Sequence, residues 1–366
     1  MPLKFKDYHT KVETGHEVKA HLPHFCDLIY ENGYNGALIA KEILKHLNEC
    51  DIGVKADGSV GLFFGKHPKN NRFFIGTKSV LSKNNPKFIF SEKDINKHYS
   101  GDENLNFRKE LKSLLENLKK IDTHNRVYQS DVLFTSKSQQ TFVSGVFPEA
   151  KIAVTPNTIT YLFEDSISDK DVCIVIHDSF IPLRKDGNSI ILSERSRKFP
   201  LKSTQSVEII DGILENTLDS IDLIIEFLDK SRNSDFLSVS NIYMEYKNSE
   251  YSDLDVFLKE YLQREQDKRS SRHGKLGVLK KVTLLKTYLN EDWFKRYIKL
   301  ADNLAIIKEE ILYDLKECKN PLVRSCIITE NDVINVDGEG YVLFYKNNQI
   351  KLVDKNSFTY WNKLNH

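Results

Sequence analysis

Strand-like segments lie at both ends of this chain, with a long helical pattern between them, and this order constrains the fold more than any other feature. Short apolar runs separated by polar turns follow one another over residues 52–177, and again over residues 321–353. In the stretch between, from residue 205 to residue 318, apolar residues recur at helical spacing. Runs of strands and runs of helices that do not alternate are typical of α+β proteins. We therefore predict an α+β fold with one sheet-bearing domain, residues 1–204 and 319–366, and a helical insertion, residues 205–318, as a candidate substrate-binding subdomain.

Two further helical patterns accompany the first strands. One covers residues 28–47, where Gly33 and Gly36 predict a turn between two helices that pack on one side of a sheet. The other covers residues 107–118. Together with the strands, they predict antiparallel sheets flanked by helices.

Charge and cysteine content exclude several classes of protein. The 366 residues carry a formal net charge of +1, so any affinity for nucleic acid must come from a local patch. The five cysteines lack Cys-x-x-Cys spacing, which favours a reducing compartment and disfavours a zinc cluster. His21 and His24 are either metal ligands or a helix entry, and the proline between them favours the entry. Because no apolar run approaches a membrane span or a signal sequence, we expect a cytoplasmic protein without a membrane partner.

A lysine in an apolar strand is the first candidate for chemistry. Lys55 lies between Val54 and Ala56, just before an Asp57-Gly58 turn. An Asp-Gly turn between apolar runs is typical of a β-hairpin, and an exposed hairpin lysine is the simpler interpretation. Partly apolar surroundings, however, disfavour the charged form of an amine, and only a neutral amine attacks phosphorus or carbonyl centres.

Two more charged residues lie on strand edges near the other end. Glu339 enters one apolar strand, and Lys351 lies in the next, after a polar turn. A lysine nucleophile, a carboxylate that holds a metal or the amine, and a second lysine that neutralises phosphate charge are the groups that nucleotidyl transfer requires. The sequence therefore predicts that Lys55, Glu339 and Lys351 meet.

Six segments, in chain order, resemble motifs of the covalent nucleotidyltransferases, the superfamily of ATP-dependent RNA and DNA ligases and mRNA capping enzymes. Residues 55–59 (Lys-Ala-Asp-Gly-Ser) resemble motif I, and residues 339–342 (Glu-Gly-Tyr-Val) resemble motif IV. The strand with Asp131 resembles motif III, the strand before His177 resembles motif IIIa, and residues 350–353 (Ile-Lys-Leu-Val) resemble motif V. Residues 76–79 (Gly-Thr-Lys-Ser) resemble the Lys-Gly-Ser element that follows motif I in tailed-phage RNA ligases. Two departures are Asp131, where the family usually has glutamate, and a single lysine where motif V usually has Lys-x-Lys.

The resemblance implies a role for each of these residues. It makes Lys55 the nucleophile and Glu339 and Lys351 its catalytic partners, with ATP as the nucleotide. It implies Mg²⁺ or Mn²⁺ as the metal, held by Glu339 and Asp131. The residues that it places against the nucleotide are Val54, Asp57, Gly58, Lys78, Asp131 and His177. Solvent exposure is the alternative for Lys78, and a place at the edge of the core is the alternative for His177. Candidates for stacking on the adenine are Tyr161, Phe163 and Phe180.

A second likeness, to a family of uncharacterised tailed-phage proteins of about this length, spans nearly the whole chain. It includes a Thr-Pro-Asn-Thr-Ile run at residues 155–159, besides the segments already named. For a phage-encoded chain, the expected location is the host cytoplasm.

Together these features predict an ATP-grasp-like ligase fold and an ATP-dependent polynucleotide ligase that forms a covalent lysyl-AMP. RNA is the favoured substrate over DNA, because little chain follows motif V in which to build an oligonucleotide-binding barrel. The basic segment from Lys268 to Lys281 is the expected nucleic-acid contact, although a solvated loop is its simpler interpretation. The alternatives are a phage nucleotidyltransferase that modifies a protein or small molecule, and a non-catalytic binding protein on a ligase-like scaffold.

Overall fold

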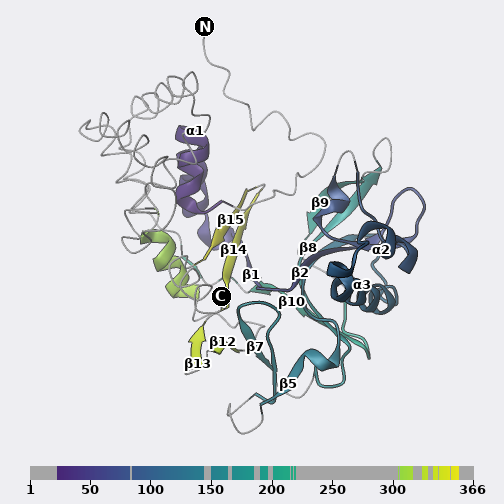
Figure 1. Cartoon of the computed structure of the whole chain (residues 1–366). Coiled ribbons are helices and arrows are strands. Elements are labelled where there is room, and N and C mark those ends of the chain that lie inside the picture. Colours follow the sequence, from purple (N-terminus) through teal and green to yellow (C-terminus); the bar gives the residue numbers. More distant parts are fainter. Residues whose placement is uncertain are drawn as a thin grey trace, which may run out of the picture.

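The structure is a computed structural model, and strands predominate over helices among the residues that it describes (Figure 1). It describes residues 23–82, 85–143, 150–163, 167–184, 190–196, 201–214, 216, 218–219, 304, 306–315, 324–328, 333–336, 338–346 and 348–353. Within these residues the strands form three sheets, called here sheets A, B and C. The predicted mixed α+β class, with antiparallel sheets, is confirmed at this level.

Sheet B is the central sheet, with its strands in the order β10-β8-β4-β2-β3 and β9 paired to β8. Its strands are β2 (Val60–Lys66), β3 (Phe73–Gly76), β4 (Val127–Phe134), β8 (Val172–Arg184), β9 (Ile190–Ser196) and β10 (Val207–Asp211). Neighbouring strands are antiparallel except β8 and β10. Apolar side chains pack on both faces of β4 and β8, which explains why β8 begins as an uninterrupted apolar run.

Helices cover one face of sheet B. They are α2 (Glu92–His98) and α3 (Leu105–Leu118), and the 3₁₀ helix η3 (Asp102–Asn104) leads into α3. The 3₁₀ helix η2 (Lys78–Leu81) instead packs Val80 against Phe63 and Phe74 in a separate cluster. Leu111, Leu114 and Leu118 of α3 pack against Leu62 and Val132 of the sheet, in one buried cluster. Figure 1 shows α2 and α3 on this side of the sheet, with α1 and sheet A on the other. The helix predicted over residues 107–118 is thus confirmed.

Sheet A has the order β11-β1-β14-β15. Its strands are β1 (Asp51–Lys55), β11 (Ile213–Leu214), β14 (Gly340–Tyr345) and β15 (Asn348–Leu352), and helix α1 (Phe25–Lys45) and the 3₁₀ helix η1 (Leu47–Glu49) precede β1. Alternate residues of these strands, such as Ile52, Val54 and Tyr341, share the largest buried cluster with α1 and with helical residues 304 and 306–315. The opposite face of sheet A therefore carries Lys55.

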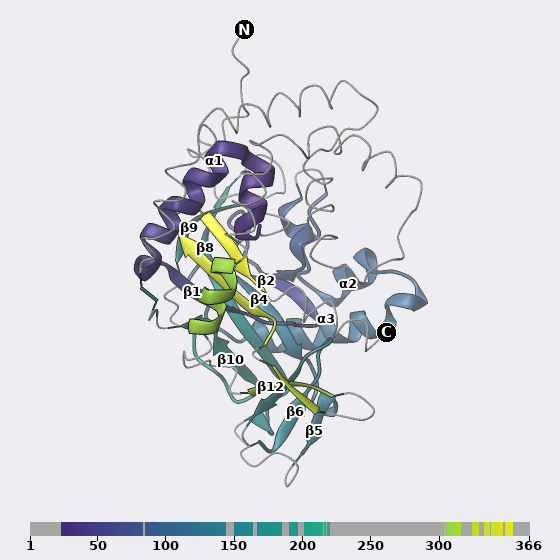
Figure 2. The same cartoon turned by 90° about the vertical axis from the view of Figure 1, so that its left-hand side faces the viewer.

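Sheet C lies at one end of the molecule in both views (Figures 1 and 2). Its order is β13-β12-β7-β6-β5, all antiparallel. The strands are β5 (Gln140–Phe142), β6 (Ile152–Val154), β7 (Thr160–Phe163), β12 (Arg324–Ile328) and β13 (Val333–Val336), and the 3₁₀ helix η4 (Lys137–Gln139) leads into β5. Tyr161 and Phe163 face the largest cluster, so sheet C closes the end of the same core.

The chain passes between sheets A and B at two adjacent points. Residues 56–59 carry it from β1 into β2, and Gly212 carries it from β10 into β11. Gly212 bonds to both sheets, since its N–H donates to Ile176 O at 3.0 Å and its carbonyl oxygen accepts from Val54 N at 2.7 Å. The Asp57-Gly58 turn is therefore a crossing between sheets rather than the tight hairpin that its residues suggest.

Three expectations need correction. The two helices predicted around Gly33 and Gly36 form one helix, α1, in which the cost of about 1 kcal/mol for each glycine is offset by packing of the apolar side. Residues 207–214, expected to begin the helical insertion, are strands of sheets B and A, so the sheet-bearing domain does not end at residue 204. Lys78, expected against the nucleotide, follows β3, and β3 pairs with β2 rather than with β1, the strand of Lys55.

The rest of the expected insertion is described only near its end, where residues 304 and 306–315 are helical, and the basic segment from Lys268 to Lys281 lies outside the described residues. In the part of the chain that is described, no helix is long and apolar enough to span a membrane.

We predict that Gly212→Ala destabilises the fold by about 1–3 kcal/mol, because an inserted methyl group forces backbone movement. A Cβ at this position would lie 2.7 Å from Ile176 O, a backbone atom of the neighbouring strand. The measurement is urea unfolding, with Gly61→Ala as the control, since a Cβ there meets its nearest atom, Asp131 Oδ1, at 3.4 Å. Equal midpoints for the two variants would contradict the tight crossing.

Candidate active site

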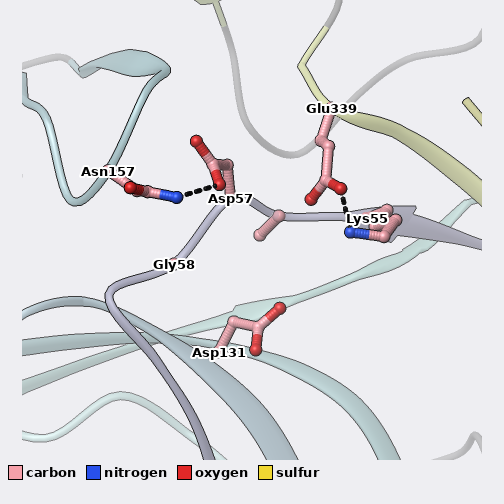
Figure 3. A pocket seen from close by; sticks show the side chains of 7 residues that line it. Lys55, Asp57, Gly58, Asp131, Asn157 and Glu339 are labelled. Carbon is pink, nitrogen blue, oxygen red and sulfur yellow. Dashed lines mark hydrogen bonds and ion pairs between the residues drawn. The ribbon is translucent and has the colours of Figure 1, made fainter. Parts of the chain in front are cut away.

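A cavity of about 280 Å³ opens where the first crossing, residues 56–59, meets sheet C. Its lining consists of Lys55, Ala56, Asp57, Gly58, Asp131, Asn157 and Glu339. Figure 3 shows these side chains converging from chain segments that are far apart in sequence. Lys55 ends β1 of sheet A, Glu339 comes directly before β14 of the same sheet, Asp131 lies in β4 of sheet B, and Asn157 lies in the β6–β7 loop of sheet C.

Lys55 and Glu339 form an ion pair inside this cavity, with side chains that are 28% and 12% exposed. Strand register brings them together, because Lys55 is paired with Gly340, the residue after Glu339. Gly340 has φ of +138°, and a Cβ there would overlap the carbonyl oxygen of Leu352. Glycine at this position lets the backbone adopt a positive φ and pass close to β15. Glu339, the residue before it, thereby lies next to Lys55.

Burial sets the protonation behaviour of Glu339. Desolvation raises the pKa of its carboxyl group, and the charge and hydrogen bond of Lys55 oppose this with a smaller effect. Asp57 and Asp131 add repulsion that raises this pKa further. A carboxylate with a raised pKa is a better proton acceptor, and its nearest donor is the Lys55 ammonium group.

Asp57 uses its carboxylate to join sheet C to the crossing. Its Oδ1 accepts from Asn157 Nδ2 at 2.8 Å, and its Oδ2 accepts from the N–H groups of Thr158 and Ile159 at 2.8 and 3.1 Å. The N–H of Asp57 donates to the Tyr161 hydroxyl at 2.6 Å. Asp57 is only 6% exposed, so these bonds satisfy a buried charge and fix the loop next to Lys55.

Gly58 is required by close approach of two strands. A Cβ at this position would lie 2.8 Å from Asp131 Cβ and 2.9 Å from the carbonyl oxygen of Val132. The N–H of Ser59 donates to that same carbonyl at 2.9 Å, so the segment is held against β4 directly after the crossing. The Asp-Gly pair thus places Lys55 on one side of the cavity and Asp131 on the other.

Asp131 is paired with His177. Asp131 Oδ2 lies 2.9 Å from His177 Nε2, on the neighbouring strand β8. This contact supplies the partner that a carboxylate in an apolar strand needs. Asp131 lines the cavity and His177 lies behind it, outside the lining.

Lys351 shares a face of sheet A with Lys55. It pairs with Val342, which pairs with Gly53, and Gly53 is two residues before Lys55. Side chains alternate along a strand, so all of these positions point to the same face. From strand spacing and rise, the Cα atoms of the two lysines are about 12 Å apart. Lys351 is therefore a neighbour of the site without lining the cavity.

Two residues expected against the nucleotide are placed elsewhere. The side chain of Val54 packs in the largest core cluster, on the face opposite Lys55. Lys78 is the first residue of η2, is exposed, and does not line the cavity. Surrounding atoms still desolvate its amine in part, and this lowers the pKa of the amine.

The three aromatic residues considered for adenine stacking also lie outside the lining. Tyr161 is fully buried beneath Asp57, and burial raises the pKa of its hydroxyl well above the usual range, so this group stays protonated. Phe163 belongs to the largest cluster and Phe180 to another apolar cluster. Sequence reasoning missed Asn157 and the Tyr161 hydroxyl as parts of the site. The Thr-Pro-Asn-Thr-Ile run was the signal for Asn157.

The donor set fits a hard divalent cation such as Mg²⁺. Asp131 and Glu339 both line the cavity, and each has one carboxylate oxygen outside its ion pair with His177 or Lys55. Carboxylate oxygens suit Mg²⁺, which commonly takes one or two of them and completes its shell with water and phosphate. Over the described residues, no three His, Cys, Asp or Glu side chains form a metal site made of protein alone.

The comparisons with known proteins identify a family. The model for DUF6267, a family of unknown function, matches residues 19–239 and 240–365. The chain belongs to this family. No curated protein and no solved structure matches the chain. The family match spans all three sheets of the fold and every residue of the cavity lining.

We predict that Asp57→Asn destabilises the fold by about 1–3 kcal/mol, because an amide nitrogen would then face N–H donors that are left unsatisfied. Urea unfolding measures the effect, and Asp169→Asn, at an exposed position in a turn, is the matched control. A variant as stable as the control would show that the carboxylate does not hold the loop at residues 157–159.

A pH dependence follows from the raised pKa of Glu339. Between its ordinary value of 4.5 and its higher value in the folded protein, the folded state binds more protons than the unfolded state. This group therefore makes stability fall as the pH rises through that window. We expect the wild type to lose stability relative to Glu339→Gln from pH 4.5 upward, measured by urea unfolding at each pH. Parallel profiles would contradict the assignment.

Proposed function

We propose that this protein is an ATP-dependent polynucleotide ligase, acting on RNA in preference to DNA, that works through a covalent lysyl-AMP. The observation that supports the proposal most is the meeting of Lys55 and Glu339 in one cavity, although they come from opposite ends of the chain. A surface ion pair would carry no such meaning, but this pair is largely buried beside two further carboxylates. In addition, residues 55–59 resemble motif I, the segment that contains the nucleophilic lysine in the covalent nucleotidyltransferases.

In the proposed first step Lys55 attacks the α-phosphate of ATP. Before it can attack, its ammonium group must lose a proton, and Glu339 is the carboxylate in contact with it. A new bond forms between Nζ and phosphorus, the bond from phosphorus to the bridging oxygen breaks, and pyrophosphate leaves with that electron pair. The raised pKa of Glu339 favours transfer of the proton to it.

The cavity carries more negative than positive charge, so a nucleotide that binds there must bring cations with it. The lining carries one lysine against three carboxylates, Asp57, Asp131 and Glu339. A triphosphate that enters is repelled unless positive charge accompanies it. Asp131 and Glu339 would hold Mg²⁺, which would supply that charge and polarise the phosphate oxygens. In this proposal Lys351, on the same face of sheet A, stabilises negative charge on the α-phosphate.

In the later steps AMP passes from Lys55 to the 5′-phosphate of the polynucleotide, and a 3′-hydroxyl then displaces it to form the phosphodiester bond. The transfer of AMP to the polynucleotide regenerates Lys55, and the attack of the 3′-hydroxyl releases AMP. The alternative acceptors are a protein and a small molecule. They share the first step, so the acceptor is decided by experiment.

The test is labelling of the chain with α-labelled ATP and Mg²⁺ or Mn²⁺. We expect label on the wild type that acid removes and alkali does not, as for a phosphoramidate. Lys55→Ala and Lys55→Arg should carry none, because neither supplies an amine that can be deprotonated near neutral pH. Lys112→Ala is the matched control, since Lys112 also pairs with a glutamate, Glu92, but on the exposed surface.

Label that persists in Lys55→Ala would overturn the nucleophile assignment. Label that forms on Lys55 but never passes to RNA or DNA would favour a protein or small-molecule acceptor over a polynucleotide.

A further inference from the structure

The β6–β7 loop brings sheet C into a cavity that sheets A and B otherwise build. This loop carries the Thr-Pro-Asn-Thr-Ile run at residues 155–159, which has no counterpart among the nucleotidyltransferase motifs described above. Thr155 and Thr160 close its base through a hydroxyl–hydroxyl bond of 2.8 Å, and Asp57 holds its tip. At that tip Asn157 is exposed at the mouth of the cavity and lines it.

The orientation of the Asn157 carboxamide follows from its partner. Its Nδ2 donates to Asp57 Oδ1 at 2.8 Å. A carboxylate accepts hydrogen bonds and donates none, so the amide nitrogen must face Asp57 and the amide oxygen must point the other way. Figure 3 shows the nitrogen of Asn157 toward Asp57 and the oxygen on the far side.

From this geometry we infer that Asn157 is a specificity-determining residue, whose Oδ1 accepts a hydrogen bond from an N–H or O–H group of the bound nucleotide. The inference rests on the proposed function, because it names the nucleotide as the ligand of the cavity. The donors that ATP offers are the 6-amino group of the base and the ribose hydroxyls. The phosphates are excluded as partners because, when ionised, they only accept.

The rest of the lining supports an acceptor role for this atom. The carboxylate of Asp57 is used by the loop, Glu339 is paired with Lys55, and Asp131 is paired with His177. Among the side chains described in the lining, Asn157 is the uncharged one with hydrogen-bonding atoms, and no partner for its Oδ1 lies among the described residues. A ligand that lacks the donor would leave this neutral acceptor without a hydrogen bond, and would therefore bind more weakly than a ligand that has the donor.

The test uses binding rather than turnover, so that it stands apart from the labelling reaction. Calorimetry measures the Kd of four nucleotides with Mg²⁺: ATP, 2′-deoxy-ATP, 3′-deoxy-ATP and purine riboside triphosphate, which lacks the 6-amino group. Full-length Lys55→Ala, which cannot form the covalent adduct, is the first background, and the wild type is the second. Each is compared with and without Asn157→Ala.

We expect one analogue to bind roughly two- to tenfold more weakly than ATP, the loss of one neutral hydrogen bond. The identity of that analogue distinguishes the base amine from either ribose hydroxyl. Asn157→Ala should bring that ratio close to one. Thr155→Ala, which loosens the same loop outside the cavity lining, is the matched control and should leave the ratio unchanged.

Two results would overturn the inference. In one, Asn157→Ala weakens ATP and all three analogues by the same factor, which is what loss of loop support alone would do. In the other, no analogue binds more weakly than ATP in either background. If ATP binds with the expected discrimination but never labels Lys55, the inference stands and the ligase proposal fails; if ATP does not bind at all, both fail.

Discussion

The buried carboxylate of Asp57 is the interaction on which the arrangement of this site depends. It lies at the crossing between sheets A and B, yet its hydrogen bonds go to the β6–β7 loop of sheet C. A single acidic side chain thereby connects all three sheets next to Lys55. Because a buried charge is costly unless fully hydrogen-bonded, this geometry leaves the crossing little freedom to move. Asp57 is thus better explained as a support of the cavity than as a direct nucleotide ligand.

Two glycines make that crossing possible. Gly58 lets the first passage lie against Asp131, and Gly212 lets the second bond to both sheets at once. As a consequence, Lys55 at the end of β1 and Glu339 just before β14 come to face Asp131 on sheet B. The Lys-x-Asp-Gly segment therefore combines a candidate nucleophile, a carboxylate that fixes the surroundings, and a residue small enough for the strands to meet.

Local pattern predicted much of this protein, and long-range pairing accounts for what it missed. Strand periodicity correctly predicted the strands that carry Lys55 and Lys351, whereas the Asp-Gly pair suggested a hairpin where the chain crosses between two sheets. The meeting of Lys55 with Glu339 was predicted from the groups that nucleotidyl transfer requires, not from local pattern. The apolar pattern that begins at residue 207 predicted a helix where the structure has a strand, because the spacing within a short apolar run does not distinguish a helix from a strand. Nor does any local feature of Asn157 reveal its bond to Asp57, a hundred residues earlier.

Peptide mapping by mass spectrometry after incubation with ATP and Mg²⁺ tests directly whether Lys55 becomes covalently adenylylated. We predict one AMP adduct, on the peptide that contains Lys55, which is lost in acid and absent when Glu339 is replaced by alanine. An adduct on a different lysine would contradict the proposed nucleophile. An unmodified Lys55 peptide in a chain that binds ATP would contradict covalent nucleotidyl transfer at this cavity.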